Sequence, residues 1–142
     1  MEILCAKDLT FTYAGEKAPV LHSCSFCVES GEFVLLYGAS GSGKTTLLRL
    51  LKPEIAPKGT RKGALRFCEK PIAELSYAQS VKEIAFTAQN PDTQQVSEYV
   101  RNELRFLPEN LGLSEAEIRL KVAETVSFFG AQDLYNRKIQ TL

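Results

Sequence analysis

One glycine-rich stretch, residues 38–45, constrains the fold of this chain more than any other. It reads Gly-Ala-Ser-Gly-Ser-Gly-Lys-Thr and matches the pattern G-x-x-x-x-G-K-[ST] at every specified position. The apolar run at residues 33–37 precedes it, and the leucine-rich residues 46–51 follow it. Strand, glycine loop and helix in this order form a P-loop. We therefore predict a strand over residues 33–37 and a helix after the loop.

The residue types of this loop suit the binding of a polyphosphate. Glycine accepts positive φ and lets the backbone approach an anion closely, and successive N–H groups at a helix start can surround phosphate oxygens. Lys44 would reach the β and γ phosphates, and the Thr45 hydroxyl would be a hard oxygen ligand for Mg²⁺. The alternative is an ordinary glycine-rich turn between strand and helix. The candidate phosphate-binding residues are Gly38, Ala39, Ser40, Gly41, Ser42, Gly43, Lys44, Thr45 and Thr46.

Composition and charge limit the other classes of protein. The 142 residues are 44% hydrophobic and 24% charged, which suits one globular domain with a core. Seventeen basic and seventeen acidic residues cancel, so no overall charge favours nucleic acid, and we interpret the basic stretch 58–62 as a solvated loop. No apolar run approaches the roughly 20 residues that span a bilayer. No N-terminal segment has the order of a secretion signal, so we expect a cytoplasmic chain.

The four cysteines, Cys5, Cys24, Cys27 and Cys68, lack the paired spacing of a zinc site. Cys24 and Cys27 fall in a segment with the pattern of a strand. A separation of three along a strand puts two side chains on opposite faces of the sheet. We therefore expect these cysteines to behave as small buried apolar residues.

Hydrophobic periodicity divides the elements into two groups. In the first group, period-two patterns predict strands over residues 3–13 and 20–28, which would form an antiparallel unit. Further short strands are expected at 63–67 and, buried, at 84–87. Between these two strands, Ser76 and Gln79 have the spacing of a capping box, which predicts a helix over residues 77–82.

From residue 96 the period changes to that of helices. We predict one helix over 97–107 and a second that begins with the capping box Ser114 to Glu117 and ends at Gly130. A last short helix is expected over 132–136. Apolar side chains of the second helix, Ile118, Val122, Val126 and Phe129, would share one buried face.

Taken together, these features resemble the nucleotide-binding domain of ABC-type ATPases, and in particular the ATPase subunits of energy-coupling factor importers of the cobalt and vitamin type. Besides the P-loop, four strings carry the resemblance: Asp-Leu-Thr-Phe-Thr-Tyr at 8–13, Gly-Glu-Phe at 31–33, Gln-Asn-Pro-Asp-Thr-Gln at 89–94 and Glu-Asn-Leu-Gly-Leu-Ser at 109–114. The resemblance covers the chain from Met1 to Leu142.

The fold implied by this resemblance is α/β: a P-loop NTPase core of the ABC type, with an N-terminal antiparallel β unit and a helical subdomain. Residues 1–142 would form the N-terminal part of one ATPase domain. Residues 1–95 would be its β-rich nucleotide-binding core and residues 96–142 its helical subdomain.

The resemblance also implies ligands and partners. ATP and Mg²⁺ would bind, with the ring of Tyr13 stacked on adenine. The amide of Gln89 would contact Mg²⁺ and the attacking water, so that Thr45 and Gln89 are the expected Mg²⁺ ligands. The partners would be a transmembrane transporter subunit and a second ATPase subunit, at the inner face of the cell membrane.

The sequence departs from the family pattern at its end. Proteins of the family continue with a Leu-Ser-Gly-Gly-Gln signature, an apolar strand ending in Asp-Glu and a switch histidine. Leu142 stands where that signature would start, and the sole histidine, His22, precedes the P-loop. We therefore assign no catalytic residue in this chain, expect it to be truncated before the signature, and leave ATP hydrolysis open. We also expect an unpaired apolar sheet edge and poor solubility.

Two other functions remain open from the sequence. One is a non-catalytic remnant or one half of a split gene product, with the same ancestry. The other is a P-loop kinase acting on a small molecule, which needs arginines that close over the phosphates. The available arginines fall at helical spacings typical of solvated faces; they are Arg101, Arg105, Arg119 and Arg137.

Overall fold

The computed structural model describes all 142 residues, which form two compact units, Met1–Phe86 and Thr87–Leu142. The first unit holds the sheet and the P-loop, and the second holds the two longest helices. The predicted division of an ATPase domain into residues 1–95 and 96–142 stays a prediction. No helix is both long enough and apolar enough to cross a bilayer.

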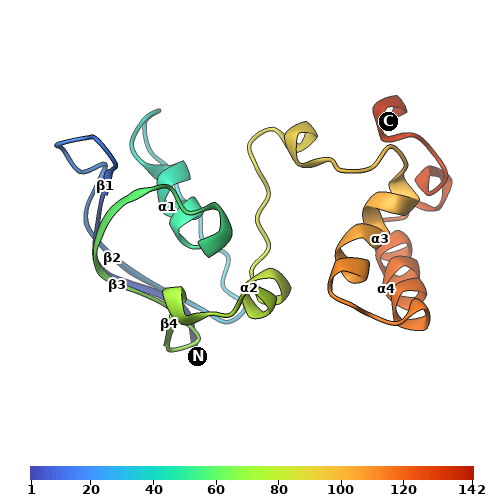
Figure 1. The fold of residues 1–142 in the computed structure, drawn as a ribbon, viewed down its shortest axis with the longest axis horizontal. Coiled ribbons are helices and arrows are strands. Elements are labelled where there is room, and N and C mark those ends of the chain that lie inside the picture. Colours follow the sequence, from blue (N-terminus) through green and yellow to red (C-terminus); the bar gives the residue numbers. More distant parts are fainter. The chain divides into compact units, whose positions relative to one another are not determined.

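The first unit is built on a four-stranded antiparallel sheet in the order β2-β1-β3-β4 (Figure 1). The strands are β1 (Glu2–Tyr13), β2 (Leu21–Glu29), β3 (Gly59–Phe67) and β4 (Lys70–Pro71). The predicted antiparallel unit is therefore confirmed. β3 begins at Gly59 rather than at Gly63, because Gly59 pairs with Tyr13 at the end of β1. Most of the basic stretch 58–62 thus lies in a strand, contrary to the interpretation as a loop.

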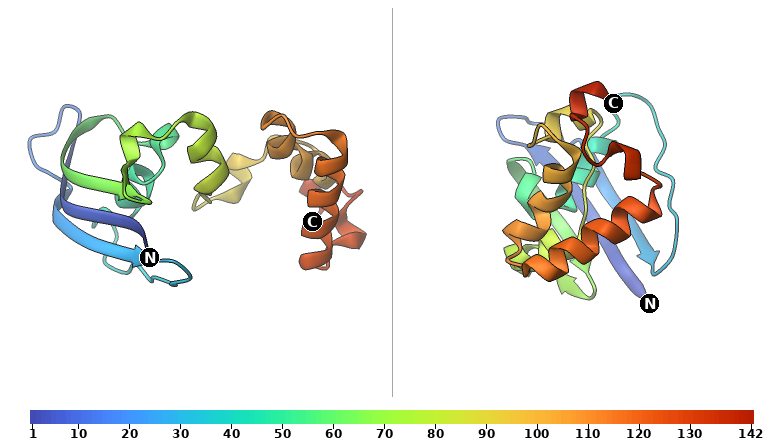
Figure 2. Two further views of the ribbon diagram at one scale, coloured as in Figure 1. Left: turned by 90° about the horizontal axis from the view of Figure 1, so that it is seen from below. Right: turned by 90° about the vertical axis from the view of Figure 1, so that its right-hand side faces the viewer.

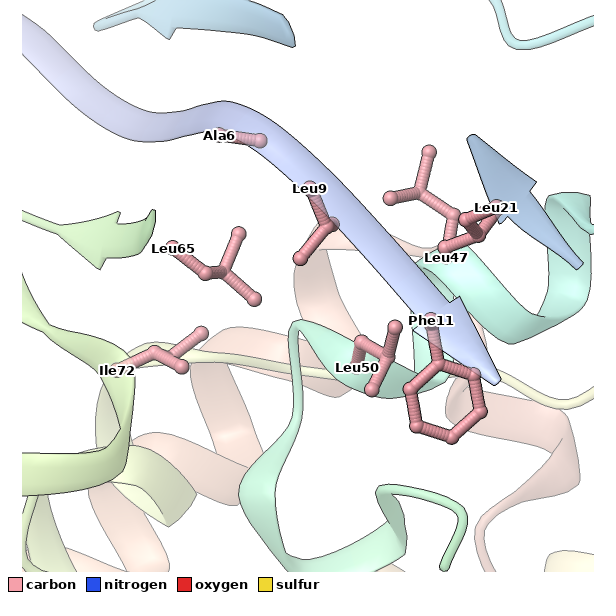
Figure 3. Packing of buried hydrophobic residues seen from close by; sticks show 8 residues of the cluster. All are labelled: Ala6, Leu9, Phe11, Leu21, Leu47, Leu50, Leu65 and Ile72. Atoms are coloured by element: carbon pink, nitrogen blue, oxygen red, sulfur yellow. The ribbon is translucent and has the colours of Figure 1, made fainter. Parts of the chain in front are cut away.

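Helix α1 (Lys44–Leu50) packs on one face of this curved sheet (Figure 2). Leu47 and Leu50 from α1 belong to the same buried cluster as Leu9 and Phe11 from β1 (Figure 3). Each such buried side chain contributes roughly 1.5–3 kcal/mol relative to exposure. The core cluster that fixes α1 to the sheet comprises Ala6, Leu9, Phe11, Leu21, Leu47, Leu50, Leu65 and Ile72.

The sheet contains an irregularity where β1 passes β3. The register shifts between Lys7 and Thr10, and Asp8 takes a φ of 50°. Opposite it, Gly63 has a φ of 83°, and a Cβ there would lie 2.3 Å from the carbonyl oxygen of Asp8. This close approach of two backbones requires glycine, as at a β-bulge.

Two predicted strands are not formed. Residues 32–39 are irregular, and the run 33–37 is exposed, with Phe33 at 91% and Leu35 at 73%. The predicted buried strand at 84–87 is also irregular, with Ile84 and Phe86 only half-buried. A strand needs a neighbouring backbone to accept and donate its hydrogen bonds. Neither segment belongs to a strand pair of the sheet.

Both predicted capping boxes are confirmed. Ser76 and Gln79 begin α2 (Tyr77–Glu83) in the first unit, and Ser114 and Glu117 begin α4 (Glu115–Phe128) in the second. α4 ends as predicted at Gly130, which has a φ of 61°. The predicted buried face is right for Ile118 and Val122 but wrong for Phe129, which is 74% exposed.

Helix α3 (Val100–Asn110) begins three residues later than predicted, since Tyr99 is extended and forms a β-bridge with Lys138. The backbone N–H of Ser97 donates to the carboxylate of Glu103 at 2.7 Å, which holds the segment before the helix. The predicted last helix is shorter than expected. The 3₁₀ helices are Pro53–Ile55, Ile72–Glu74, Pro91–Gln94, Gln132–Leu134 and Ile139–Thr141.

Candidate nucleotide-binding site

The P-loop follows β2 and the irregular residues 32–37, and it leads directly into α1. Gly38, Gly41 and Gly43 have φ values of 155°, 79° and 92°, which side-chain-bearing residues rarely adopt. The Ser42 N–H donates to the carbonyl of Ala39 at 3.2 Å, and a Cβ on Gly38 would lie 3.0 Å from Ser42 Oγ. The loop is therefore tight, and its glycines hold backbone conformations that other residues rarely adopt.

The ammonium group of Lys44 folds back over this loop. Its Nζ donates to the carbonyl oxygens of Gly38 and Ala39, both at 2.8 Å, and lies 3.5 Å from Ser42 Oγ. The lysine charge is thus held beside the loop backbone. A phosphate oxygen is a stronger acceptor for an ammonium than a carbonyl, so these contacts can be exchanged for a polyphosphate.

Gly43 fixes the end of the loop against the sheet. It is the N-cap residue of α1, and a Cβ there would lie 2.8 Å from Leu21 Cδ2 and 3.0 Å from the carbonyl oxygen of Val20. The N–H of Val20 in turn donates to the carbonyl of Phe11 at 2.8 Å. The start of α1 therefore lies directly against the start of β2, next to β1.

Tyr13 lies at the end of β1 and contacts α1. Its hydroxyl and Thr46 Oγ1 are 2.7 Å apart and share a hydrogen bond. Its ring meets the ring of Phe11 edge-on at 5.2 Å, and the side chain keeps 36% exposure. Since Thr46 is buried, this bond fixes the tyrosine next to the P-loop helix while leaving part of its ring open to a planar ligand.

The two predicted Mg²⁺ ligands, Thr45 and Gln89, belong to different units of the chain. Thr45 is exposed in the first turn of α1, which suits a metal ligand. Gln89 belongs to the second unit, so its predicted role stays a prediction. Local hydrogen bonds hold the segment around Gln89. The Ala88 N–H donates to Gln94 Oε1 at 2.6 Å, and Asn90 caps the 3₁₀ turn that begins at Pro91.

Beyond α1, a polar cluster joins the chain after the helix to α2. Lys52 Nζ donates to the Ser80 carbonyl at 2.8 Å and lies 3.3 Å from Glu54 Oε2, while Ser80 Oγ donates to the same carboxylate at 2.9 Å. Burial raises the pKa of Glu54, but hydrogen bonds from its own backbone, Ser80 and Lys52 together outweigh it, and the net pKa is lowered. A charged Glu54 thus holds the end of α1 in place.

Two contacts that position the site were not predicted from the sequence. One is the packing of Gly43 on Val20 and Leu21, and the other is the bond from Tyr13 to Thr46. Both join residues far apart in the chain. The period-two pattern of the first strand could have indicated that Tyr13 shares a face with Phe11, but no local signal identifies Thr46 as its partner.

The glycine loop with its lysine, leading directly into a helix, has the features of the phosphate-binding loop of P-loop nucleotide-binding proteins. The family can also be stated. Residues 21–142 match the family model described as ABC transporter, which is most of the chain, and this chain therefore belongs to that family.

Individual relatives agree with this assignment. A putative ABC transporter ATP-binding protein of Bacillus anthracis is 41% identical over 96% of this chain and 25% of its own length. The energy-coupling factor transporter ATP-binding protein EcfA of Syntrophomonas wolfei is 32% identical over 94% of this chain and 48% of its own length. This chain thus spans about a quarter to a half of these curated relatives.

A solved structure supports the fold. The chain is similar to cbiO1 of Clostridium perfringens, described as part of the ABC transporter complex cbiONQ, with a TM-score of 0.83 and 27% identity. The match covers 99% of this chain and 55% of cbiO1. The predicted fold class, a P-loop NTPase of the ABC type with an antiparallel β unit and a helical part, is therefore confirmed.

Proposed function

We propose that this chain binds MgATP as the N-terminal part of the ATPase subunit of an energy-coupling factor importer. The observation that carries the proposal is the folded P-loop, in which three positive-φ glycines and Lys44 lie beside a tyrosine fixed to α1. The assignment to an energy-coupling factor importer rests on the similarity to EcfA and cbiO1.

Each residue of the loop has a proposed role in nucleotide binding. The backbone N–H groups and Lys44 hold the phosphates, and the Tyr13 ring stacks on adenine. Thr45 and Gln89 hold Mg²⁺, which neutralises phosphate charge when it is bound. The loop suits a phosphate group because glycine at positions 38, 41 and 43 lets the backbone approach an anion closely. No residue of this chain is assigned as a general base, so hydrolysis belongs to the proposal for the longer protein.

The proposed partners are a transmembrane transporter subunit and a second ATPase subunit. The support is the description of cbiO1 as part of a transporter complex. We propose that the chain acts at the inner face of the membrane, bound through its partners. The contact with the transmembrane subunit would lie on the helical subdomain, residues 96–142.

Three of the four arginines named for the kinase alternative are engaged by other side chains. Arg105 is engaged by Glu109 at 2.8 Å and by Glu115 at 2.6 Å, and Arg119 pairs with Glu115 at 2.9 Å. Arg101 lies over the ring of Tyr99 at 4.8 Å. These guanidinium groups already have partners within the helical unit.

A non-catalytic remnant or one half of a split gene product would keep the same nucleotide site. Such a protein would therefore bind nucleotide as the proposed ATPase subunit does and would differ from it only in ATP hydrolysis.

Nucleotide binding tests the proposal. A fluorescent ATP analogue is titrated into the chain in the presence of Mg²⁺, and Lys44→Ala is expected to weaken binding about tenfold or more. The reason is that a hydrogen bond to a charged group contributes roughly 1.5–3 kcal/mol. The matched control is Lys82→Ala, which removes an exposed lysine of α2. Equal affinities for Lys44→Ala and the parent chain would overturn the proposal.

A further inference from the structure

A pair of cysteines lies on the sheet away from the nucleotide site. Cys5 of β1 and Cys27 of β2 are register partners, with Cα atoms 4.2 Å apart, and they form a disulfide. The expectation of buried cysteines is therefore wrong. Cys5 is half-buried and Cys27 is exposed, and the other two, Cys24 and Cys68, are free thiols that are half-buried and exposed respectively.

A carboxylate stands next to this pair. Glu2 Oε2 lies 3.1 Å from Cys5 Sγ, a contact that is no hydrogen bond while the sulfur is in a disulfide and carries no proton. One ligand atom each from Glu2, Cys5 and Cys27 lies within 4.8 Å of the other two. We propose that, once reduced, these three side chains bind a soft or borderline divalent cation such as Zn²⁺, and that the disulfide closes this site.

The geometry suits tetrahedral coordination. Zn–S bonds of about 2.3 Å and Zn–O bonds of about 2.0–2.2 Å place neighbouring ligand atoms about 3.5 Å apart. The two sulfurs reach that separation from the disulfide by small side-chain rotations, because the β1–β2 register already sets Cys5 opposite Cys27. Three protein ligands leave a fourth position for water or another ligand.

Basic residues lie around the cysteine pair. Arg66 of β3 is the register partner of Cys5 on the side opposite Cys27. Arg66 and Lys7 line the same hollow of about 610 Å³ as the two cysteines. They also offset the charge of two thiolates and a carboxylate around a dication.

Opening and closing of the site both proceed by exchange with a small-molecule thiol. Two molecules of reduced glutathione supply two electrons and two protons to the Cys5–Cys27 disulfide and leave as oxidised glutathione. Metal binding then releases both protein thiol protons. Exchange with a small-molecule disulfide such as oxidised glutathione returns the protein disulfide and yields two reduced thiols of the reagent. The same two sulfurs therefore serve either the metal or the disulfide, never both.

Metal titration of the whole chain tests this inference. The background variant is Cys24→Ser with Cys68→Ser, which removes the two free thiols. Zn²⁺ is titrated in competition with a chromophoric chelator, and Cd²⁺ binding is followed by its thiolate charge-transfer band in the ultraviolet. We expect one equivalent of metal in the phosphine-reduced protein and none after oxidised glutathione has closed the disulfide.

Two variants in the same background localise the site. Cys27→Ser is expected to weaken binding at least about 100-fold, and Glu2→Gln about 10-fold, since it keeps both thiolates. Glu2 is exposed, so its variant should fold, which far-ultraviolet circular dichroism verifies. Absence of binding in the reduced background, or full binding in Cys27→Ser, would overturn the proposal. An unchanged metal affinity in Glu2→Gln would show that Glu2 is not a ligand and would overturn that part of the proposal.

Discussion

At the scale of single residues, two glycines show that contacts with residues distant in the sequence decide whether a position can carry a side chain. Gly15 and Gly63 have nearly the same φ, at 87° and 83°. A Cβ on Gly15 would meet nothing within 4 Å, whereas one on Gly63 would lie 2.3 Å from the carbonyl oxygen of Asp8. Comparing alanine substitutions at these two glycines therefore separates the cost of backbone strain from the cost of steric overlap.

We predict that Gly63→Ala destabilises the first unit far more than Gly15→Ala does. Both variants carry the strain of a left-handed residue, about 1–2 kcal/mol. Gly63→Ala must also displace the backbone of β1, which adds about 1–3 kcal/mol as overpacking does in a core. Urea denaturation followed by circular dichroism measures the difference. Equal midpoints for the two variants would show that the β1–β3 approach is looser than described.

At the scale of elements, an ion cluster joins the two main helices of the second unit. Glu115 at the start of α4 binds Arg105 of α3 at 2.6 Å and Arg119 of its own helix at 2.9 Å. Hydrogen bonds from Arg105 and then from Arg119 lower the pKa of the Glu115 carboxyl from 4.5 to about 2. The pKa of Arg105 is raised correspondingly by Glu115 and Glu109.

The sign of this shift gives a pH prediction for the helix pair. Because the folded chain lowers the pKa of Glu115, its contribution to stability is complete above pH 4.5 and is lost as the pH falls to about 2. Glu115→Gln should lower the melting temperature above pH 4.5 and match the parent near pH 2. The effect is small because the side chain is exposed to solvent. Glu124→Gln, an exposed glutamate of the same helix, is the control and should behave like the parent throughout.

At the scale of the whole molecule, the exposed apolar run 33–37 is the main liability. Its side chains retain between 42% and 91% exposure, and no strand of the sheet pairs with its backbone. A contiguous run of exposed Phe, Val, Leu and Tyr promotes association in solution. The chain should therefore self-associate and bind hydrophobic dyes.

We predict that the double substitution Phe33→Lys and Leu35→Lys lowers this association several-fold, because charge at an exposed apolar segment opposes pairing with other chains. Analytical ultracentrifugation measures the monomer fraction. Ala73→Lys with Ala78→Lys adds the same charge at exposed positions elsewhere and serves as control. A sharp, reversible unfolding transition of a monomeric parent chain would contradict the prediction.

The sequence by itself determined the local features of this protein. The P-loop pattern, the two capping boxes and the stop at Gly130 depend on side chains a few residues apart, and the structure contains each of them. The period-two pattern likewise located β1 and β2 to within one residue. Such signals are readable because their causes are short-range: φ preference, capping and alternation of faces.

Tertiary structure decided the rest. Residues 33–37 have the composition of a buried strand, yet they are exposed and irregular because no paired backbone satisfies them. Cross-strand register made a disulfide of Cys5 and Cys27, which are 22 positions apart, and the bond from Tyr13 to Thr46 likewise joins two distant residues at the P-loop. Composition sets the strand propensity of a segment, but the segment forms a strand only where a neighbouring backbone can pair with it.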